Sequence, residues 1–261
     1  MPESMRIQRA LARAGVASRR GAEELVAAGR VRINGAVAET GQSVDPSRDK
    51  ITVDGKGIGA PPPVRWIVLN KPTGVLTTRA DPGGRRTVFD MVEASPGLTY
   101  VGRLDYMTEG VLLLTTDGDA AHKLTHPSSE VERTYVATVR GEGANAARAA
   151  RSGVELEDGL VMPRDVSVRR IARGLWELTI TIAEGKTREV RRLCEALGLK
   201  VERLVRTQFG PVKLGSLEPG STRPLTQREK EIISALGRSR SGATGKTTGG
   251  ARRERTGRNS H

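Results

Sequence analysis

The stretch Gly102–Gly118, GRLDYMTEGVLLLTTDG, joins a polar loop to a core strand. Gly102 and Gly110 bracket the loop, and residues 111–114 form an aliphatic run of the length expected for a buried strand. Asp117 follows where a helix cap is favoured. A loop anchored to a core strand can aim one side chain, and Asp105 is its candidate. For the tetrapeptide GRLD alone, a turn or capping role for the acid remains open.

As a whole, this stretch resembles the signature loop of the pseudouridine synthases, in the ribosomal RNA branch that includes the RsuA, RluB and RluE types. The resemblance implies that Asp105 is the catalytic residue. Four further stretches resemble family segments in the same order along the chain. They are LNKPTGVLTT (69–78), RTYVATVRG (133–141) with Tyr135 stacking on the target base, EGKTREVRRLCEALG (184–198) with Arg191 pairing with the catalytic Asp, and VERLVRTQFGPVKLGSLEPGSTRPLT (201–226) with Leu204 lining the pocket.

Composition favours a polyanionic partner. The formal net charge of the 261 residues is +13, and Lys and Arg release counterions when they bind phosphates. The N-terminus shows no apolar leader, and the single Cys194 fits a reducing compartment, so we expect a cytoplasmic protein. The three histidines have no zinc-ligand spacing, and neither a P-loop nor a GxGxxG after a strand is present. We therefore expect no metal and no cofactor.

The N-terminal part, residues 1–62, has the pattern of a compact module that ends in the Pro-rich linker 59–63. Helical patterns at 6–14 and 18–28 precede short alternating strands. The segment resembles the RNA-binding domain of ribosomal small-subunit protein four, which implies that two helices present cations to an RNA backbone. A solvated helix face is the alternative, because Glu23 and Glu24 dilute the charge. The candidate RNA contacts are Arg9, Arg13, Ser18, Arg19, Arg20, Arg30 and Arg32.

Residues 63–236 alternate strand and helix patterns. Residues 175–182 alternate with a period of two and predict a half-buried strand, and 187–197 predict an amphipathic helix that ends at Gly198. Arginines near that helix start oppose its dipole, so one of them needs an anionic partner, either Asp105 or Glu195. Further candidate RNA contacts in this part are Lys71, Arg85, Arg86, Arg103 and Arg188. Arg85 and Arg86 belong to the loop 77–90, which could clasp an RNA strand or be an exposed turn.

We expect an α+β protein: a small N-terminal RNA-binding domain (1–62), a synthase domain (63–236) and a disordered basic tail (237–261). The family resemblance implies a mainly antiparallel mixed sheet flanked by helices in the second domain. It also implies conversion of a uridine in ribosomal RNA to pseudouridine, with Asp105 as nucleophile or base on a flipped-out nucleotide.

The loops around Tyr135 and at 77–90 resemble the RluB type, which acts on large-subunit RNA, more than the RsuA type, which acts on small-subunit RNA. A noncatalytic RNA-binding or ribosome-assembly protein is the competing hypothesis, and it leaves the Asp105, Tyr135 and Arg191 segments unused. Ribosomal RNA is the expected partner. We expect no protein partner and a monomer.

Overall fold

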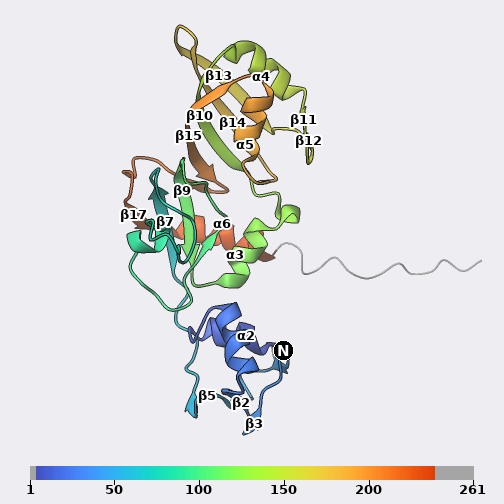
Figure 1. The fold of residues 1–261 in the computed structure, drawn as a ribbon, viewed down its shortest axis with the longest axis vertical. Helices are drawn as coiled ribbons and strands as arrows, with labels where there is room; N and C mark the ends of the chain where they lie inside the picture. The colour runs from blue at the N-terminus through green and yellow to red at the C-terminus, as the bar shows by residue number, and fades with distance from the viewer. Residues whose placement is uncertain (1–3, 239–261) are drawn as a thin grey trace, which may run out of the picture.

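The structure is a computed structural model, of which residues 4–238 are described. The basic tail that the sequence predicts to be disordered lies, beyond Arg238, outside the described residues. Within them, three hydrophobic cores are present, one in the N-terminal unit and two in the remainder. Figure 1 shows the N-terminal unit at one end of an elongated molecule and the large sheet running away from it. No helix in residues 4–238 is long and apolar enough to cross a membrane.

The N-terminal unit packs two helices against short strands. Ser18 caps the second helix by accepting a hydrogen bond from the Gly21 amide at 3.1 Å, as the sequence predicts. Ile7, Leu11 and Val31 form the centre of its buried core. The elements are β1 (Met5–Arg6), α1 (Ile7–Arg13), α2 (Arg19–Ala27), β2 (Val31–Ile33), β3 (Ala36–Val37), β4 (Ser43–Val44), β5 (Ile51–Val53) and β6 (Lys56–Gly57). The strands pair as β1-β4 and as β3-β2-β5-β6.

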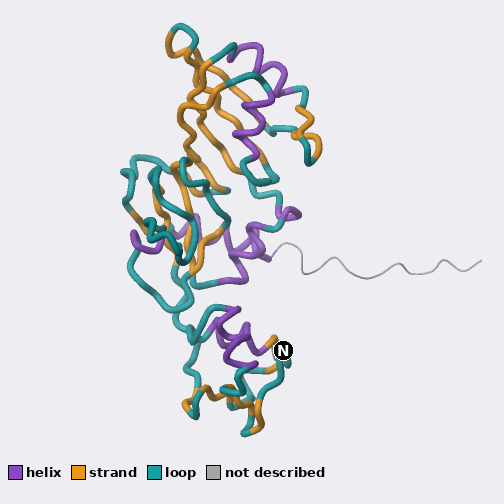
Figure 2. Tube along the Cα trace, in the orientation of Figure 1, coloured by secondary structure: helices purple, strands orange, loops and turns teal. Residues whose placement is uncertain are grey.

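The remainder is built on a nine-stranded sheet, which Figure 2 shows as the long orange segments. Along its main path the order is β13-β14-β10-β15-β9-β7-β17, and β16 and β8 pair with β15 and β9. The strands are β7 (Trp66–Lys71), β8 (Thr99–Val101), β9 (Thr108–Thr115), β10 (Arg133–Arg140), β13 (Asp165–Ala172), β14 (Leu175–Ile182), β15 (Lys200–Phe209), β16 (Val212–Lys213) and β17 (Thr222–Pro224). The expected α+β class with a mainly antiparallel mixed sheet is confirmed.

Helices cover the sheet, as Figure 1 shows. α4 and α5 contribute to one core, and α3 and α6 contribute to the other. Asp117 caps α3 by accepting from two backbone amides, as predicted. The remaining elements are η1 (Val88–Met91), α3 (Gly118–Thr125), η2 (Pro127–Ser129), α4 (Gly143–Arg151), the hairpin β11 (Val154–Leu156) and β12 (Gly159–Val161), α5 (Glu189–Ala196) and α6 (Gln227–Arg238).

The central strand β9 is buried on both faces. Leu112 and Leu114 point into one core, and Val111 and Leu113 point into the other. A strand covered on both sides needs a continuous apolar run rather than an alternating one, which explains the sequence VLLL. The strand begins at Thr108, three residues before this run, because its polar start pairs with β15.

The pairing of β9 with β15 is the parallel pairing of this sheet, and it is three residues long. Thr108, Glu109 and Gly110 lie opposite Leu204, Val205 and Arg206 respectively. Gly110 has φ +105°, and a Cβ atom at this position would overlap with the carbonyl group of Arg206. Glycine therefore permits the close approach of the two strands.

We predict that Gly110→Ala destabilises the protein by at least about 2 kcal/mol, because it combines a steric overlap with a backbone conformation unfavourable to Ala. Thermal unfolding of the purified variant measures the effect as a lower melting temperature. Gly118→Ala is the matched control, since a Cβ at Gly118 would meet nothing within 4 Å and its φ is not positive. Equal melting temperatures for the two variants would contradict the close-approach argument.

Candidate active site

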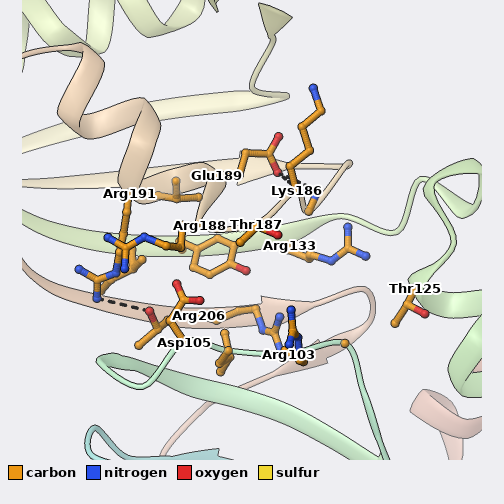
Figure 3. Close-up of a pocket in the computed structure, with 17 residues that line it drawn as sticks. Arg103, Asp105, Thr125, Arg133, Lys186, Thr187, Arg188, Glu189, Arg191 and Arg206 are labelled. Atoms are coloured by element: carbon orange, nitrogen blue, oxygen red, sulfur yellow. Dashed lines mark hydrogen bonds between the residues drawn. The ribbon is translucent and has the colours of Figure 1, made fainter. Parts of the chain in front are cut away.

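Four residues that the sequence singles out line one cavity of about 260 Å³. Asp105 lies in the loop before β9, Tyr135 on β10, Arg191 on α5 and Leu204 on β15. On the sheet, Tyr135 lies opposite Arg206, and Arg206 is two residues from Leu204 along β15. Tyr135 and Leu204 therefore project from the same face of the sheet. Figure 3 shows Asp105 and Arg191 at one end of the cavity and Thr125 at the other. The structure thus brings together side chains from four separate segments.

The loop that carries Asp105 is closed by hydrogen bonds at both ends. The Thr108 amide donates to the Asp105 carbonyl at 3.0 Å, which forms a tight turn. On the other side, the Thr77 hydroxyl donates to the Leu104 carbonyl at 2.8 Å and accepts from the Leu104 amide at 3.3 Å. A backbone held in this way fixes the direction of the Asp105 side chain.

Lys71, which the sequence offers as an RNA contact, is not at the surface of the protein. It is fully buried at the end of β7, and its Nζ donates to the carbonyl oxygens of Pro72 at 2.9 Å, Tyr106 at 3.4 Å and Thr108 at 2.9 Å. Burial lowers the pKa of Lys71 to about 8, and the nearby carboxylate of Asp105 opposes this shift. Because a buried ammonium held by three carbonyls cannot reach a phosphate, we withdraw Lys71 from the RNA-contact set. Its hydrogen bonds support the loop that carries Asp105.

Arg191 reaches the same loop from α5. Its Nη2 donates to the Met107 carbonyl at 2.8 Å and lies 3.3 Å from the Thr108 hydroxyl. Burial lowers the pKa of the Arg191 guanidinium, while the negative charge of Asp105 opposes that shift. The interaction of Arg191 with Asp105 is therefore electrostatic, and its hydrogen bonds go to the residues that follow Asp105.

The neighbouring arginines of α5 have other anionic partners. Arg188 lies 3.7 Å from Glu195, and Arg192 lies 2.7 Å from Asp158. The sequence offers two anionic partners for these arginines, Asp105 and Glu195. In the structure Glu195 lies beside Arg188, and the loop that carries Asp105 lies beside Arg191. Arg188 and Arg191 both line the cavity, whereas Arg192 is held outside it by Asp158.

The wall opposite Asp105 is a loop held by two buried charged residues. The Arg133 guanidinium donates to the carbonyls of residues 183 and 184 at 2.8 and 2.6 Å. The Glu189 carboxylate accepts from the amides of residues 185 and 186 at 2.7 and 2.9 Å. Burial raises the pKa of Glu189, and its two amide donors oppose the shift. These contacts hold the wall in one conformation.

Arg206 forms part of the cavity floor beside Tyr135 and is only 2% exposed. Its Nε donates to the Val111 carbonyl at 2.7 Å, and its guanidinium lies 5.2 Å from the centre of the Phe209 ring. Sequence reasoning missed Thr77, Glu189 and Arg206 as site residues. For Arg206 a signal was present, because it lies two residues from Leu204 on a strand and therefore shares its face.

The sequence model of a known family matches most of the segments that build this cavity, although Leu204 and Arg206 lie beyond the matched range. The model described as RNA pseudouridylate synthase matches residues 65–196, and the model described as S4 domain matches residues 5–50. The chain belongs to the RNA pseudouridylate synthase family. The family expected from the sequence is thereby confirmed, and so is the N-terminal domain of the ribosomal protein four type.

Full-length relatives of this synthase are found in bacteria. An uncharacterised RNA pseudouridine synthase of Mycobacterium tuberculosis is 43% identical, with 90% of this chain and 96% of the relative covered. The ribosomal large subunit pseudouridine synthase B of Bacillus subtilis is 40% identical, with 88% of this chain and 96% of the relative covered. The Pseudomonas aeruginosa protein of that name is 45% identical over 90% of this chain but only 63% of its own length. A solved pseudouridylate synthase superposes with a TM-score of 0.60 at 30% identity, covering 89% of this chain and 99% of the other.

Several cations that the sequence offers as RNA contacts in the synthase have intramolecular partners. Arg9 and Arg19 both contact Asp119 on α3, with nitrogen–oxygen distances of 2.6 and 3.3 Å. Asp119 therefore ties the N-terminal unit to the catalytic part. The others are placed as follows: Arg30 pairs with Asp54, Arg32 donates to the Gly35 carbonyl, Arg85 pairs with Asp81, Arg20 and Arg86 are exposed, Arg13 lines the space between the two units, Arg103 lines both that space and the cavity, and Arg188 lines the cavity.

The lowered pKa of Lys71 predicts a pH-dependent stability. Between pH 8 and 10.5 the folded synthase has released the Lys71 proton, whereas the unfolded chain still binds it. Stability rises with pH wherever the unfolded state binds more protons, so the wild type should gain up to about 3 kcal/mol relative to Lys71→Met across this window. Urea unfolding of both proteins at pH 7.5, 9 and 10.5 measures the difference. A difference that stays constant with pH would contradict the burial of a titrating amine.

Proposed function

We propose that this synthase converts a specific uridine of large-subunit ribosomal RNA to pseudouridine, in the cytoplasm and without a cofactor. The observation that carries the proposal is the convergence of Asp105, Tyr135, Arg191 and Leu204 on one cavity of about 260 Å³. The choice of large-subunit RNA is supported by the printed names of the Bacillus subtilis and Pseudomonas aeruginosa relatives, both ribosomal large subunit pseudouridine synthase B.

The reaction breaks the bond between the uracil N1 and the ribose C1′ and forms a bond between C5 and C1′. The proton on C5 is lost and N1 gains one, so no group leaves the RNA and no external oxidant is required. Such a reaction needs a carboxylate that attacks or moves a proton, and a pocket that retains the detached base. Asp105 supplies the carboxylate in this proposal.

The surrounding residues hold the uridine and the loop. Tyr135 offers an aromatic face for the uracil, and stacking of this kind contributes about 1–3 kcal/mol. Leu204 excludes water on the neighbouring strand, where it is 3% exposed. Arg191 holds the residues that follow Asp105 and places a positive charge near its carboxylate. The target base must leave its stack to reach this cavity, and the N-terminal domain would hold the RNA by its backbone.

Asp105→Asn should abolish pseudouridine formation while leaving RNA affinity within about threefold, because the change removes a charge but little volume. The assay incubates purified protein with large- and small-subunit ribosomal RNA separately and maps pseudouridine by chemical labelling and sequencing. Asp158→Asn is the control, since Asp158 pairs with Arg192 outside the cavity. Normal turnover by Asp105→Asn would refute the role of Asp105. Modification of small-subunit RNA alone would refute only the choice of substrate.

Arg191→Lys should reduce the single-turnover rate by about tenfold to a hundredfold, because Lys keeps the charge but loses the geometry of the guanidinium that holds Met107 and Thr108. Arg192→Lys is the matched control on the same helix, because Arg192 pairs with Asp158 at the surface. The measurement is the rate of pseudouridine formation at saturating enzyme. Similar rates for the two variants would remove Arg191 from the working site.

A further inference from the structure

A groove of about 760 Å³ lies between the N-terminal unit and the catalytic part. One wall is formed by α1, α2 and the turn between them, and the other by α3, β8 and the loops around β8. Gly102, Arg103 and Thr125 line both this groove and the cavity that contains Asp105, so the two spaces adjoin. Figure 3 shows Thr125 at the end of the cavity remote from Asp105. An RNA strand that enters the cavity therefore has a path along the groove.

The lining of this groove is strongly cationic. Among the described residues that line it, Asp119 is the one acid, and a tyrosine, Tyr100, adds an aromatic side chain. The cations are the five arginines Arg9, Arg13, Arg19, Arg79 and Arg103. A groove of guanidinium groups with an aromatic side chain matches the backbone and bases of a nucleic acid strand. Asp119 is the residue that such a strand would repel.

Asp119, in the first turn of α3, joins the two walls of the groove. Its Oδ2 accepts from the Nε and Nη2 of Arg9 at 3.0 and 2.6 Å, and its Oδ1 accepts from the Nη2 of Arg19 at 3.3 Å. Two guanidiniums that share the oxygens of one anion can bind a phosphate in the same way. The side chains of Asp119 and Arg19 are 24% and 54% exposed, and ion pairs open to solvent are weak. A phosphate can therefore replace the carboxylate.

The two units share no hydrophobic core within residues 4–238. The core of the N-terminal unit draws on residues 5–58, and the other two cores draw on residues 66–233. The units also meet at Pro96, whose Cβ would lie 2.6 Å from a Cβ on Gly15. Units without a common core can shift relative to one another. Breaking the contacts of Asp119 therefore leaves the core of each unit intact.

We propose that Asp119 holds the position of an RNA phosphate. In the free protein its carboxylate binds Arg9 and Arg19, and on binding the backbone of the RNA strand that flanks the target uridine displaces the carboxylate and takes both guanidiniums. The inference rests on the proposed function, because it concerns the strand that leads into the cavity of Asp105. The exchange lets the protein keep its cations paired in the absence of RNA and release them to a polyanion.

The test measures binding of a fluorescein-labelled oligouridylate by fluorescence anisotropy. This probe supplies the phosphate backbone and the target base, and it does not require the modified site to be known. Asp119→Asn keeps the shape of the side chain but removes the charge that RNA has to displace, so it should bind about threefold to fivefold more tightly than the wild type. The gain should disappear in the Arg9→Gln/Arg19→Gln background, because no guanidinium is left for Asp119 to hold.

Two results would overturn the exchange. An affinity of Asp119→Asn equal to or below that of the wild type would show that the carboxylate only docks the two units. A gain of the same size in the Arg9→Gln/Arg19→Gln background would show that Asp119 acts through its charge alone.

The matched control is Glu202→Gln. Glu202 also contacts two cations, Arg140 at 3.1 Å and Lys200 at 3.8 Å. Arg140 lies five residues, about 17 Å, along β10 from Tyr135. The control removes the same charge beyond the screening distance of the cavity, so its affinity should stay within about 1.5-fold of wild type. A gain equal to that of Asp119→Asn would overturn the proposal in favour of an effect of net charge.

A second measurement counts the phosphate contacts directly. The logarithm of the affinity falls linearly with the logarithm of the salt concentration, with a slope of about 0.7 for each phosphate contact of a single strand. Arg9→Gln/Arg19→Gln should therefore reduce the slope by about 1.4, whereas Arg140→Gln/Lys200→Gln should leave it unchanged. Equal slopes for wild type and Arg9→Gln/Arg19→Gln would overturn the exchange. Absence of pseudouridine formation by the wild type, with the slope difference intact, would instead overturn the proposed function.

Discussion

The site depends on the close approach of two strands, β9 and β15, at Gly110. Their three-residue parallel pairing joins the part of the sheet that carries Asp105 to the part that carries Tyr135 and Leu204. A side chain at Gly110 would force the strands apart, and the cavity between them would lose its floor. The relative positions of the Asp105 loop and of the strands that carry Tyr135 and Leu204 therefore depend on this close approach at Gly110.

Buried and half-buried cations hold the walls of the cavity in place. Lys71 and the half-buried Arg191 bind carbonyls of the Asp105 loop, Arg133 binds carbonyls of the opposite wall, and Arg206 binds a carbonyl of β9. Burial of a charged group is costly unless its hydrogen bonds are satisfied, and backbone carbonyls supply part of the acceptors here, whereas the Nε of Arg191 and the Nη2 of Arg206 are buried without a hydrogen-bond partner among the described residues. The arrangement orders these loops and keeps positive charge near the carboxylate of Asp105, in a cavity that Glu189 also lines.

Local features were the ones that the sequence predicted well. The caps at Ser18 and Asp117 and the alternation of β14 depend on neighbouring residues, and the structure contains all three. The assembly of Asp105, Tyr135, Arg191 and Leu204 in one cavity was reached through family resemblance rather than through spacing.

Contacts between residues far apart in the chain could not be predicted from the sequence. Nothing local indicates that Lys71 is buried, because its burial comes from strands placed on both sides of β7. For the same reason the sequence offered Arg9 and Arg19 as free RNA contacts, although their partner Asp119 lies 100 or more residues away. The parallel pairing of β9 with β15 likewise joins segments nearly a hundred residues apart.

We propose that Asp105, held at this junction, modifies a uridine of large-subunit ribosomal RNA. The most direct test maps pseudouridine across both ribosomal RNAs from cells that lack the gene and carry either the wild-type protein or Asp105→Asn. We expect one large-subunit pseudouridine that is restored by the wild type and absent with Asp105→Asn. Restoration of that pseudouridine by Asp105→Asn, or maps that do not differ between the two strains, would contradict it.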